Sequence, residues 1–279
     1  MTEVIDKANI SYIKWDMNRC MTEVYSSCHD SESQGRVMHE YILGVYQLYE
    51  LLTNRFPEIL FESCASGGAR FDPGMMYYAP QCWTSDDTDA LERLKIQYGT
   101  SMVYPVSSLG AHVSAAPNHQ LLRNTPIETR ANVAYFGTFG YELDLNKLNM
   151  DEQIKVKEQI TFMKDYREII QFGTFYRLKS PFEGNETVWM VVSQDQNTAI
   201  IGYYRTLQEV NVGYRRVKLL GLDPDKEYHV NLNNTVHYGD ELMNLGLITT
   251  DSSCGENKEK YDGTNGDYLS RIYVLKAKI

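Results

Sequence analysis

The chain has 279 residues, 43% of them hydrophobic and 23% charged, which is the composition of an ordinary soluble globular protein. Its formal net charge of -10 argues against nucleic acid or an anionic membrane surface as a partner. Neutral ligands remain compatible with that charge. The 21 tyrosines could offer flat faces to sugar rings, or could simply lie on the surface of a β-rich domain.

The five cysteines follow no paired motif; they are Cys20, Cys28, Cys64, Cys82 and Cys254. Such spacing indicates reduced thiols rather than a disulfide framework or a zinc site. The six histidines show no metal-ligand spacing either. Residues 1–10 lack the apolar stretch of a signal peptide, and no apolar run approaches the length of a membrane span. We therefore expect a cytoplasmic protein without a metal ion or a membrane partner.

Strand-like and helix-like segments alternate through the first 178 residues. Strands are expected at residues 11–18, 59–63, 79–84, 102–106 and 133–141. A helix is expected at residues 39–55, with Tyr41, Val45, Leu48 and Leu52 on one face, and a second at residues 89–98. The alternation predicts a parallel sheet covered by helices, either doubly wound or a barrel. Five strands fall short of the eight that close a barrel.

A long helix is expected after Asn149, because Glu152 stands three residues later as in a capping box. Its inward stripe would be Val156, Ile160, Met163 and Ile170. After Ser180 the pattern changes to short β-favouring runs at residues 188–192, 199–204, 217–220, 228–232 and 272–275. These runs predict an antiparallel β-sandwich, so the expected domains are residues 1–178 and 179–279.

Two carboxylates stand at the ends of expected strands, Asp16 within Lys14-Trp15-Asp16-Met17-Asn18-Arg19 and Asp86 within Trp83-Thr84-Ser85-Asp86-Asp87-Thr88-Asp89. A (β/α) barrel builds its active site at such strand ends, and glycoside hydrolysis needs two carboxylates. Asp16 could instead be a helix cap or pair with Lys14 or Arg19. Lys14 is expected on the same strand face as Asp16, where it could keep the carboxylate ionised.

The aspartate cluster has competing explanations. At least one of Asp87, Thr88 and Asp89 is expected to cap the next helix. The spacing lacks the glycine and distal glutamate of a calcium loop, whereas crowding would raise the pKa of one carboxyl, as a general acid requires. In Cys64-Ala65-Ser66-Gly67-Gly68, Cys64 could be a nucleophile or a buried thiol, and the glycines would let a ligand approach the backbone.

In order and spacing, these segments resemble glycoside hydrolase family 36, the bacterial α-galactosidases. The motifs concerned are residues 14–19, Cys64-Ala65-Ser66-Gly67-Gly68-Ala69-Arg70-Phe71-Asp72 and residues 83–89, with Asp16 and Asp86 70 residues apart. Gly221-Leu222-Asp223-Pro224 and Gly239-Asp240-Glu241-Leu242-Met243 are similar to the family's C-terminal β domain. The resemblance implies the last five or so βα units of a (β/α)8 TIM barrel followed by an antiparallel β-sandwich.

The resemblance also implies a retaining reaction on terminal α-galactosides such as melibiose and raffinose. Asp16 would be the nucleophile and Asp86 the acid/base. The implied substrate-binding residues are Lys14, Trp15, Met17, Asn18, Cys64, Gly67 and Trp83. No metal or organic cofactor is implied, and the family suggests a homo-oligomer.

Family members are much longer, and their paired aspartate, tryptophan and arginine of the galactose pocket would lie upstream of residue 1. The chain is therefore expected to be the C-terminal part of an enzyme. Two alternatives stay open at this point. The chain could be an inactive remnant that only binds sugar or a partner chain, or a galactosyl transferase of the raffinose-synthase type.

Overall fold

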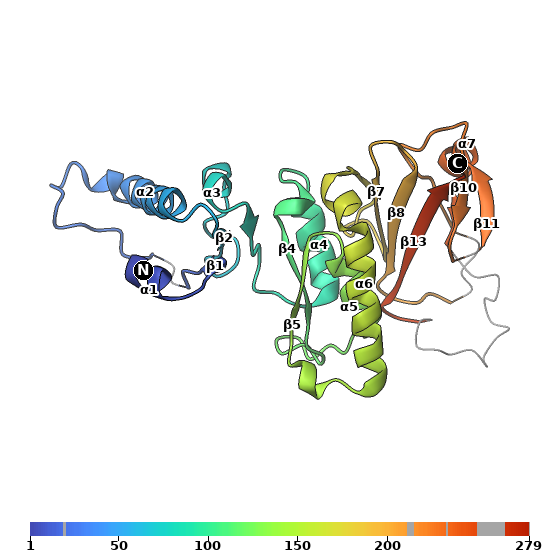
Figure 1. The fold of residues 1–279 in the computed structure, drawn as a ribbon, viewed down its shortest axis with the longest axis horizontal. Helices are drawn as coiled ribbons and strands as arrows, with labels where there is room; N and C mark the ends of the chain where they lie inside the picture. Colours follow the sequence, from blue (N-terminus) through green and yellow to red (C-terminus); the bar gives the residue numbers. More distant parts are fainter. Residues whose placement is uncertain (19–20, 211–214, 233, 250–265, 279) are drawn as a thin grey trace. The chain divides into compact units, whose positions relative to one another are not determined.

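The computed structural model describes residues 1–18, 21–210, 215–232, 234–249 and 266–278. The chain divides into two compact units, Met1–Asp86 and Asp87–Ile279. Arg19, Cys20 and Cys254, which the sequence analysis named, lie outside the described residues. Figure 1 labels the helices and strands of both units.

The first unit is built on three parallel strands in the order β1-β2-β3. Its elements are α1 (Thr2–Lys7), β1 (Tyr12–Trp15), η1 (Gln34–Arg36), α2 (Val37–Arg55), β2 (Leu60–Ser63), α3 (Pro73–Tyr78) and β3 (Gln81–Cys82). Helix α2 buries Val45, Tyr49 and Leu52 against Phe61 of β2 and Met75 of α3. This cluster fixes one face of the sheet against α2 and leaves the other face for polar residues.

The strand register decides which side chains share that polar face. Lys14 is paired with Glu62, and Glu62 with Gln81 on the next strand. Side chains alternate between faces along a strand, so Trp15 points to the opposite face, where its ring lies 4.5 Å from that of Tyr49.

The second unit begins with helices around a pair of parallel strands. Its elements are α4 (Ala90–Thr100), η2 (Val106–Ser108), β4 (Gly110–Ser114), α5 (Ile127–Ala134), β5 (Thr138–Glu142), η3 (Leu145–Lys147) and α6 (Met150–Phe172). Strand β4 pairs with β5 in parallel. Asn149 caps α6 in a capping box with Glu152, as the sequence predicted.

The rest of the second unit is antiparallel. The elements are β6 (Thr174–Lys179), β7 (Glu186–Val192), β8 (Thr198–Arg205), β9 (Arg216–Val217), β10 (Glu227–Val230), β11 (Thr235–Tyr238), α7 (Gly239–Asn244), β12 (Leu247–Ile248) and β13 (Leu269–Ala277). Six strands form one sheet in the order β11-β10-β13-β8-β7-β6, and β12 pairs with β9.

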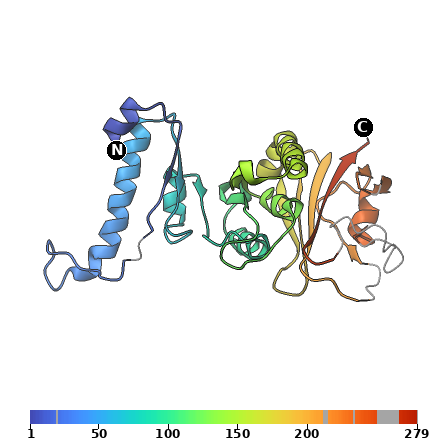
Figure 2. The same ribbon diagram turned by 90° about the horizontal axis from the view of Figure 1, so that it is seen from below.

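Strands β7 and β8 of the six-stranded sheet are apolar on both faces because each face has a partner. Trp189, Val191 and Tyr204 face the cluster that contains α5 and α6, which lie beside the sheet (Figure 1 and Figure 2). Val188 and Tyr203 point to the opposite face of the sheet, where they belong to the second cluster with residues of β9, α7 and β12. Two buried faces explain why β7 and β8 are nearly continuous hydrophobic runs.

Several sequence expectations were wrong in detail. Residues 102–106 form no strand, because Met102 and Val103 are exposed in the turn after α4. The expected strand at 133–141 is the end of α5 followed by β5. Leu48 and Ile160, expected inward, are exposed. The boundary predicted between residues 178 and 179 falls within β6 and stays a prediction.

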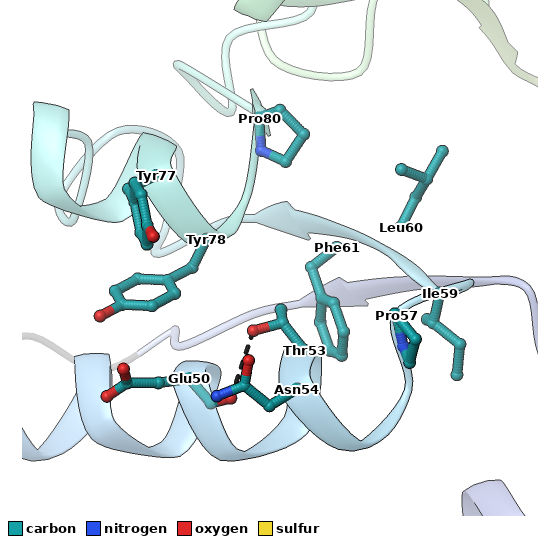
Figure 3. A pocket seen from close by; sticks show the side chains of 10 residues that line it. All are labelled: Glu50, Thr53, Asn54, Pro57, Ile59, Leu60, Phe61, Tyr77, Tyr78 and Pro80. Carbon is teal, nitrogen blue, oxygen red and sulfur yellow. Dashed lines mark hydrogen bonds between the residues drawn. The ribbon is translucent and has the colours of Figure 1, made fainter.

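No helix among the described residues has both the length and the apolar character needed to cross a bilayer. The unit formed by residues 1–86 holds a pocket of about 300 Å³ between α2, α3 and the amino ends of β2 and β3 (Figure 3). Its lining includes a single carboxylate, Glu50, so it lacks the pair that glycoside hydrolysis requires.

Candidate active site

The candidate site lies where the three parallel strands of the first unit end. Asp16, Cys64 and Trp83 each follow directly after the last residue of β1, β2 and β3. Backbone hydrogen bonds extend the ladder one step further: Cys64 N donates to Trp15 O at 3.1 Å, and Trp83 N donates to Ser63 O at 3.0 Å. The three side chains therefore come to one edge of the sheet, as the sequence predicted for strand ends.

The Asp16 carboxylate is surrounded by hydrogen-bond donors. Its Oδ1 accepts the backbone N–H of Met17 at 2.7 Å. It also accepts hydrogen bonds from the Cys64 and Asn18 side chains and from the backbone N–H of Ser66. Burial by itself raises the pKa of the Asp16 carboxyl, but these donors outweigh it and hold the pKa below its ordinary value. The environment thus favours the ionised form, which a nucleophile needs.

The glycine-rich turn joins Asp16 to Asp86. Ser66 and Gly67 both adopt positive φ, 49° and 83°. A Cβ on Gly67 would stand 2.6 Å from Ser85 Cα and 3.1 Å from Asp86 N. The turn therefore touches Asp16 through the Ser66 amide and the Asp86 backbone through Gly67. In the structure, the backbone of Ser85 and Asp86 is what approaches Gly67 closely.

The polar face below Asp16 holds a group that the sequence analysis missed. Glu62 is buried, accepts a hydrogen bond from Tyr12 Oη, and lies 3.8 Å from Lys14 Nζ. The Lys14 ammonium also stands 5.2 Å from the centre of the Trp83 ring. Lys14 thus pairs with Glu62, while hydrogen bonds account for the ionised Asp16. An acidic residue inside an apolar strand was the available signal for Glu62.

The aspartate cluster divides into structural and exposed members. Asp89 caps α4 by accepting from the backbone N–H groups of Leu91 and Glu92, and it also pairs with Arg123. Asp87 accepts the Asp89 amide at 3.0 Å. The expectation of a structural cap in this cluster is thereby confirmed. Asp86 is the exposed carboxylate of the group and lies next to Gly67.

The remaining predicted site residues take different positions. Met17 Sδ accepts a hydrogen bond from Tyr41 Oη at 2.9 Å, and Trp83 is buried. Trp15 lies on the α2 face of the sheet, opposite Asp16. Burial raises the pKa of the Cys64 thiol to about 11, so this thiol is a protonated donor to Asp16. The raised pKa disfavours the thiolate that a nucleophilic Cys64 would need.

Metal chemistry was not expected at this site. Within the described ranges, no three histidine, cysteine or acidic side chains cluster so that they could hold a metal ion. The donors around Asp16 are two side chains and two backbone amides, which suit a carboxylate rather than a cation.

Comparison with known families gives two matches that together cover most of the chain. The melibiase family model matches residues 1–173, and the model of the glycosyl hydrolase family 36 C-terminal domain matches residues 186–275.

Curated relatives are similar over nearly the whole chain. Alpha-galactosidase AgaA of Geobacillus stearothermophilus is 50% identical over 99% of this chain, and alpha-galactosidase Mel36A of Lactobacillus acidophilus is 45% identical over 99%. Each alignment covers 36% of the relative. The chain therefore spans about a third of the length of the curated relatives it matches.

Solved structures give the same result in three dimensions. The crystal structure of the alpha-galactosidase from Lactobacillus brevis superposes with a TM-score of 0.93 at 50% identity, covering 100% of this chain and 37% of the other. AgaA superposes with a TM-score of 0.91, covering 99% and 37%. These neighbours confirm the expected fold, the last βα units of a barrel followed by a C-terminal β domain. The chain belongs to the melibiases of glycoside hydrolase family 36.

Proposed function

We propose that this protein is part of a retaining α-galactosidase that cleaves terminal α-D-galactosyl residues from oligosaccharides such as melibiose and raffinose. The observation that supports this most directly is the turn at Ser66 and Gly67, which contacts Asp16 on one side and Asp86 on the other. A turn that donates to the Asp16 carboxylate and packs against the Asp86 backbone, at the carboxyl ends of parallel strands, suits a two-step displacement at a sugar carbon.

Asp16 is the nucleophile in this proposal. Its carboxylate attacks the anomeric carbon, the bond to the leaving oxygen breaks, and a covalent β-galactosyl-enzyme forms. Asp86 gives its proton to the departing oxygen and then takes one from the water that hydrolyses the intermediate. Retention requires the two carboxyl groups to lie about 5–5.5 Å apart, and this distance is part of the proposal.

Substrate contacts are proposed for the residues around this pair. They are Lys14, Trp15, Met17, Asn18, Cys64, Gly67 and Trp83. Lys14 and Asn18 would donate hydrogen bonds to sugar hydroxyls from the face that Asp16 occupies. The Trp83 ring would form one wall of the galactose pocket. Trp15 would contribute through its backbone and through its packing on Tyr49. No cofactor has a role in this reaction.

Relatives support the substrate class. AgaA has been crystallised in complex with raffinose and with stachyose. Each complex contains one replaced aspartate, Asp→Asn with raffinose and Asp→Ala with stachyose, and the two positions lie 70 residues apart in that protein. Asp16 and Asp86 have the same separation.

Three finer properties belong to the same proposal. The protein acts in carbohydrate metabolism, it does so in the cytoplasm, and the full-length enzyme is a homo-oligomer. The unpaired pattern of cysteines supports the compartment. The barrel and β domains would divide as residues 1–178 and 179–279.

Azide rescue tests the two roles separately, with an aryl α-galactoside as substrate. The unchanged chain should release the aryl alcohol, and Asp16→Gly should lose this activity. Azide should then restore turnover of Asp16→Gly as the β-galactosyl azide, and of Asp86→Gly as the α-galactosyl azide. Asp30 is a matched control, since hydrogen bonds from Ser33 lower the pKa of this exposed carboxyl too; Asp30→Asn should keep full activity.

The alternatives give different results in the same experiment. Equal turnover by the unchanged chain and Asp16→Gly would refute intrinsic activity. A fluorosugar that leaves no hexosyl mass on the Asp16 peptide would refute the nucleophile assignment. Product analysis with excess sucrose separates the reactions, because a transferase makes a trisaccharide where a hydrolase makes free galactose.

A further inference from the structure

Arg70 is a buried cation at the base of the candidate site to which the proposed reaction assigns no role. It is 6% exposed and stands at the end of the glycine-rich turn. Its Nη2 donates to two main-chain carbonyls, Trp15 O at 3.0 Å and Cys64 O at 2.7 Å. Within the described residues, its Nε has no hydrogen-bond partner. Burying a guanidinium with an unused donor is costly, so its position needs an explanation.

Both carbonyls already belong to the link between β1 and β2. Trp15 O accepts the Cys64 amide at 3.1 Å, and Cys64 O accepts the Met17 amide at 3.1 Å. Each oxygen has two lone pairs, so the Arg70 donor can be added without displacing the ladder bond. One guanidinium nitrogen therefore ties the last residue of β1 to the first residue after β2.

Among the described residues, these two segments supply the four hydrogen bonds that Asp16 accepts. Met17 and Asn18 follow β1, whereas Cys64 and Ser66 follow β2. The donors converge on one carboxylate only while the two segments keep their spacing. We infer that Arg70 is a positioning residue for Asp16: it joins the ends of β1 and β2 and so holds the carboxylate among its donors. The functional importance of this inference rests on the proposed role of Asp16.

The inference is geometric rather than electrostatic. The leading influences on the Asp16 carboxyl are burial and four hydrogen bonds, and the Arg70 charge is not among them. A lysine at position 70 would keep the charge but would lack the planar guanidinium whose Nη2 reaches both carbonyls. Arg70→Lys therefore separates the two explanations.

The direct test is a carboxyl ¹³C NMR titration of Asp16 in the full chain, with the signal assigned by Asp16→Asn. We expect Arg70→Lys to raise the pKa of Asp16 by about 0.5 or more, because the donor set loosens. Arg130→Lys is the matched control. Arg130 is 7% exposed and also donates to two carbonyls, Ser114 O and Thr125 O, but in the other unit. It should leave the Asp16 titration unchanged.

An unchanged Asp16 titration in folded Arg70→Lys would overturn the inference. If Arg70→Lys does not fold, amide hydrogen exchange in the unchanged chain decides the matter. The Met17 amide should then be as protected as the Phe61 amide within β2, and exchange of Met17 at the rate of an open loop would overturn the inference.

Activity provides an independent readout. With an aryl α-galactoside, Arg70→Lys should lower kcat, leave KM nearly unchanged, and move the acid limb of the kcat profile upward. If the unchanged chain shows no turnover, the proposed function fails for this chain, but the titration and the exchange still decide the role of Arg70.

Discussion

Gly67→Ala is the most informative single substitution, since it acts where the turn touches the Asp86 backbone. Gly67 has φ of 83°, and an added Cβ would stand 2.6 Å from Ser85 Cα. An alanine in a left-handed conformation costs about 1–2 kcal/mol. Forcing an extra carbon into a packed site costs about 1–3 kcal/mol, and here the neighbours are backbone atoms that cannot rotate away. We therefore expect a loss of about 2–5 kcal/mol in the unfolding free energy of the first unit.

Urea unfolding followed by tryptophan fluorescence can measure this loss. The chain has three tryptophans, of which Trp15 and Trp83 lie in the first unit. A Trp189→Phe background therefore makes the signal specific for that unit. Gly44→Ala is the matched control: Gly44 lies inside α2 with open space around its Cα, and alanine there should stabilise by up to about 1 kcal/mol.

The same variant tests whether the turn positions Asp86 relative to Asp16. Any adjustment that accommodates the new Cβ moves Ser85 and Asp86 away from the turn, and a misplacement of about 1 Å can cost about 10²-fold in rate. Gly67→Ala should therefore lose far more activity than its stability loss explains at temperatures where it is folded. An unfolding midpoint and slope equal to those of the unchanged chain would refute the close approach.

Three further predictions concern other positions. Asn149→Ala should cost about 1 kcal/mol of unfolding free energy and Asn149→Ser much less, because serine also caps; equal losses in urea titrations would contradict the capping box. Because the folded pKa of Asp16 lies below its ordinary value of 3.8, Asp16 stabilises the fold above that value, and this contribution is lost as the pH falls through the folded pKa. Urea midpoints of the unchanged chain and Asp16→Asn should therefore converge in acid, and a constant difference from pH 6 to pH 2 would refute it. Native labelling with iodoacetamide should modify Cys28 first, because Cys28 is exposed. Burial raises the pKa of Cys64 to about 11 and that of Cys82 to about 12, so both thiols should react slowly. Mass spectrometry showing Cys82 modified as fast as Cys28 would contradict the burial of Cys82.

Local signals predicted the elements that depend on local physics. The capping box at Asn149 and the amphipathic pattern of residues 39–55 required no knowledge of distant residues, and both helices are present. Residues 102–106 misled because an apolar run of strand length can also be a solvent-exposed turn. Strand β4 was missed because Gly110-Ala111-His112-Val113-Ser114 has little β propensity and is held by its pairing with β5.

The sequence was informative about the candidate site where single residues are unusual for their position. Asp16 and Asp86 stand out as carboxylates at strand ends, whereas Arg70 contacts Trp15, 55 residues away in sequence. Only the folded chain brings such partners together. The sheet face on which Trp15 lies could also have been predicted. Side chains alternate along a strand, so Trp15 must lie on the face opposite Lys14 and Asp16.

Glu62 and Arg70 explain how the fold accommodates the charged side chains around the candidate site. Glu62 forms an ion pair with the Lys14 ammonium on the polar face of the sheet. This pairing compensates the positive charge of Lys14 next to the site. Arg70 donates hydrogen bonds to two backbone carbonyls. Asp16 accepts hydrogen bonds from neutral donors. Among the described residues, hydrogen bonds from neutral groups hold the pKa of the Asp16 carboxyl below its ordinary value. If Asp16 is the nucleophile, as proposed, these donors keep its carboxylate charged for the attack on the sugar carbon.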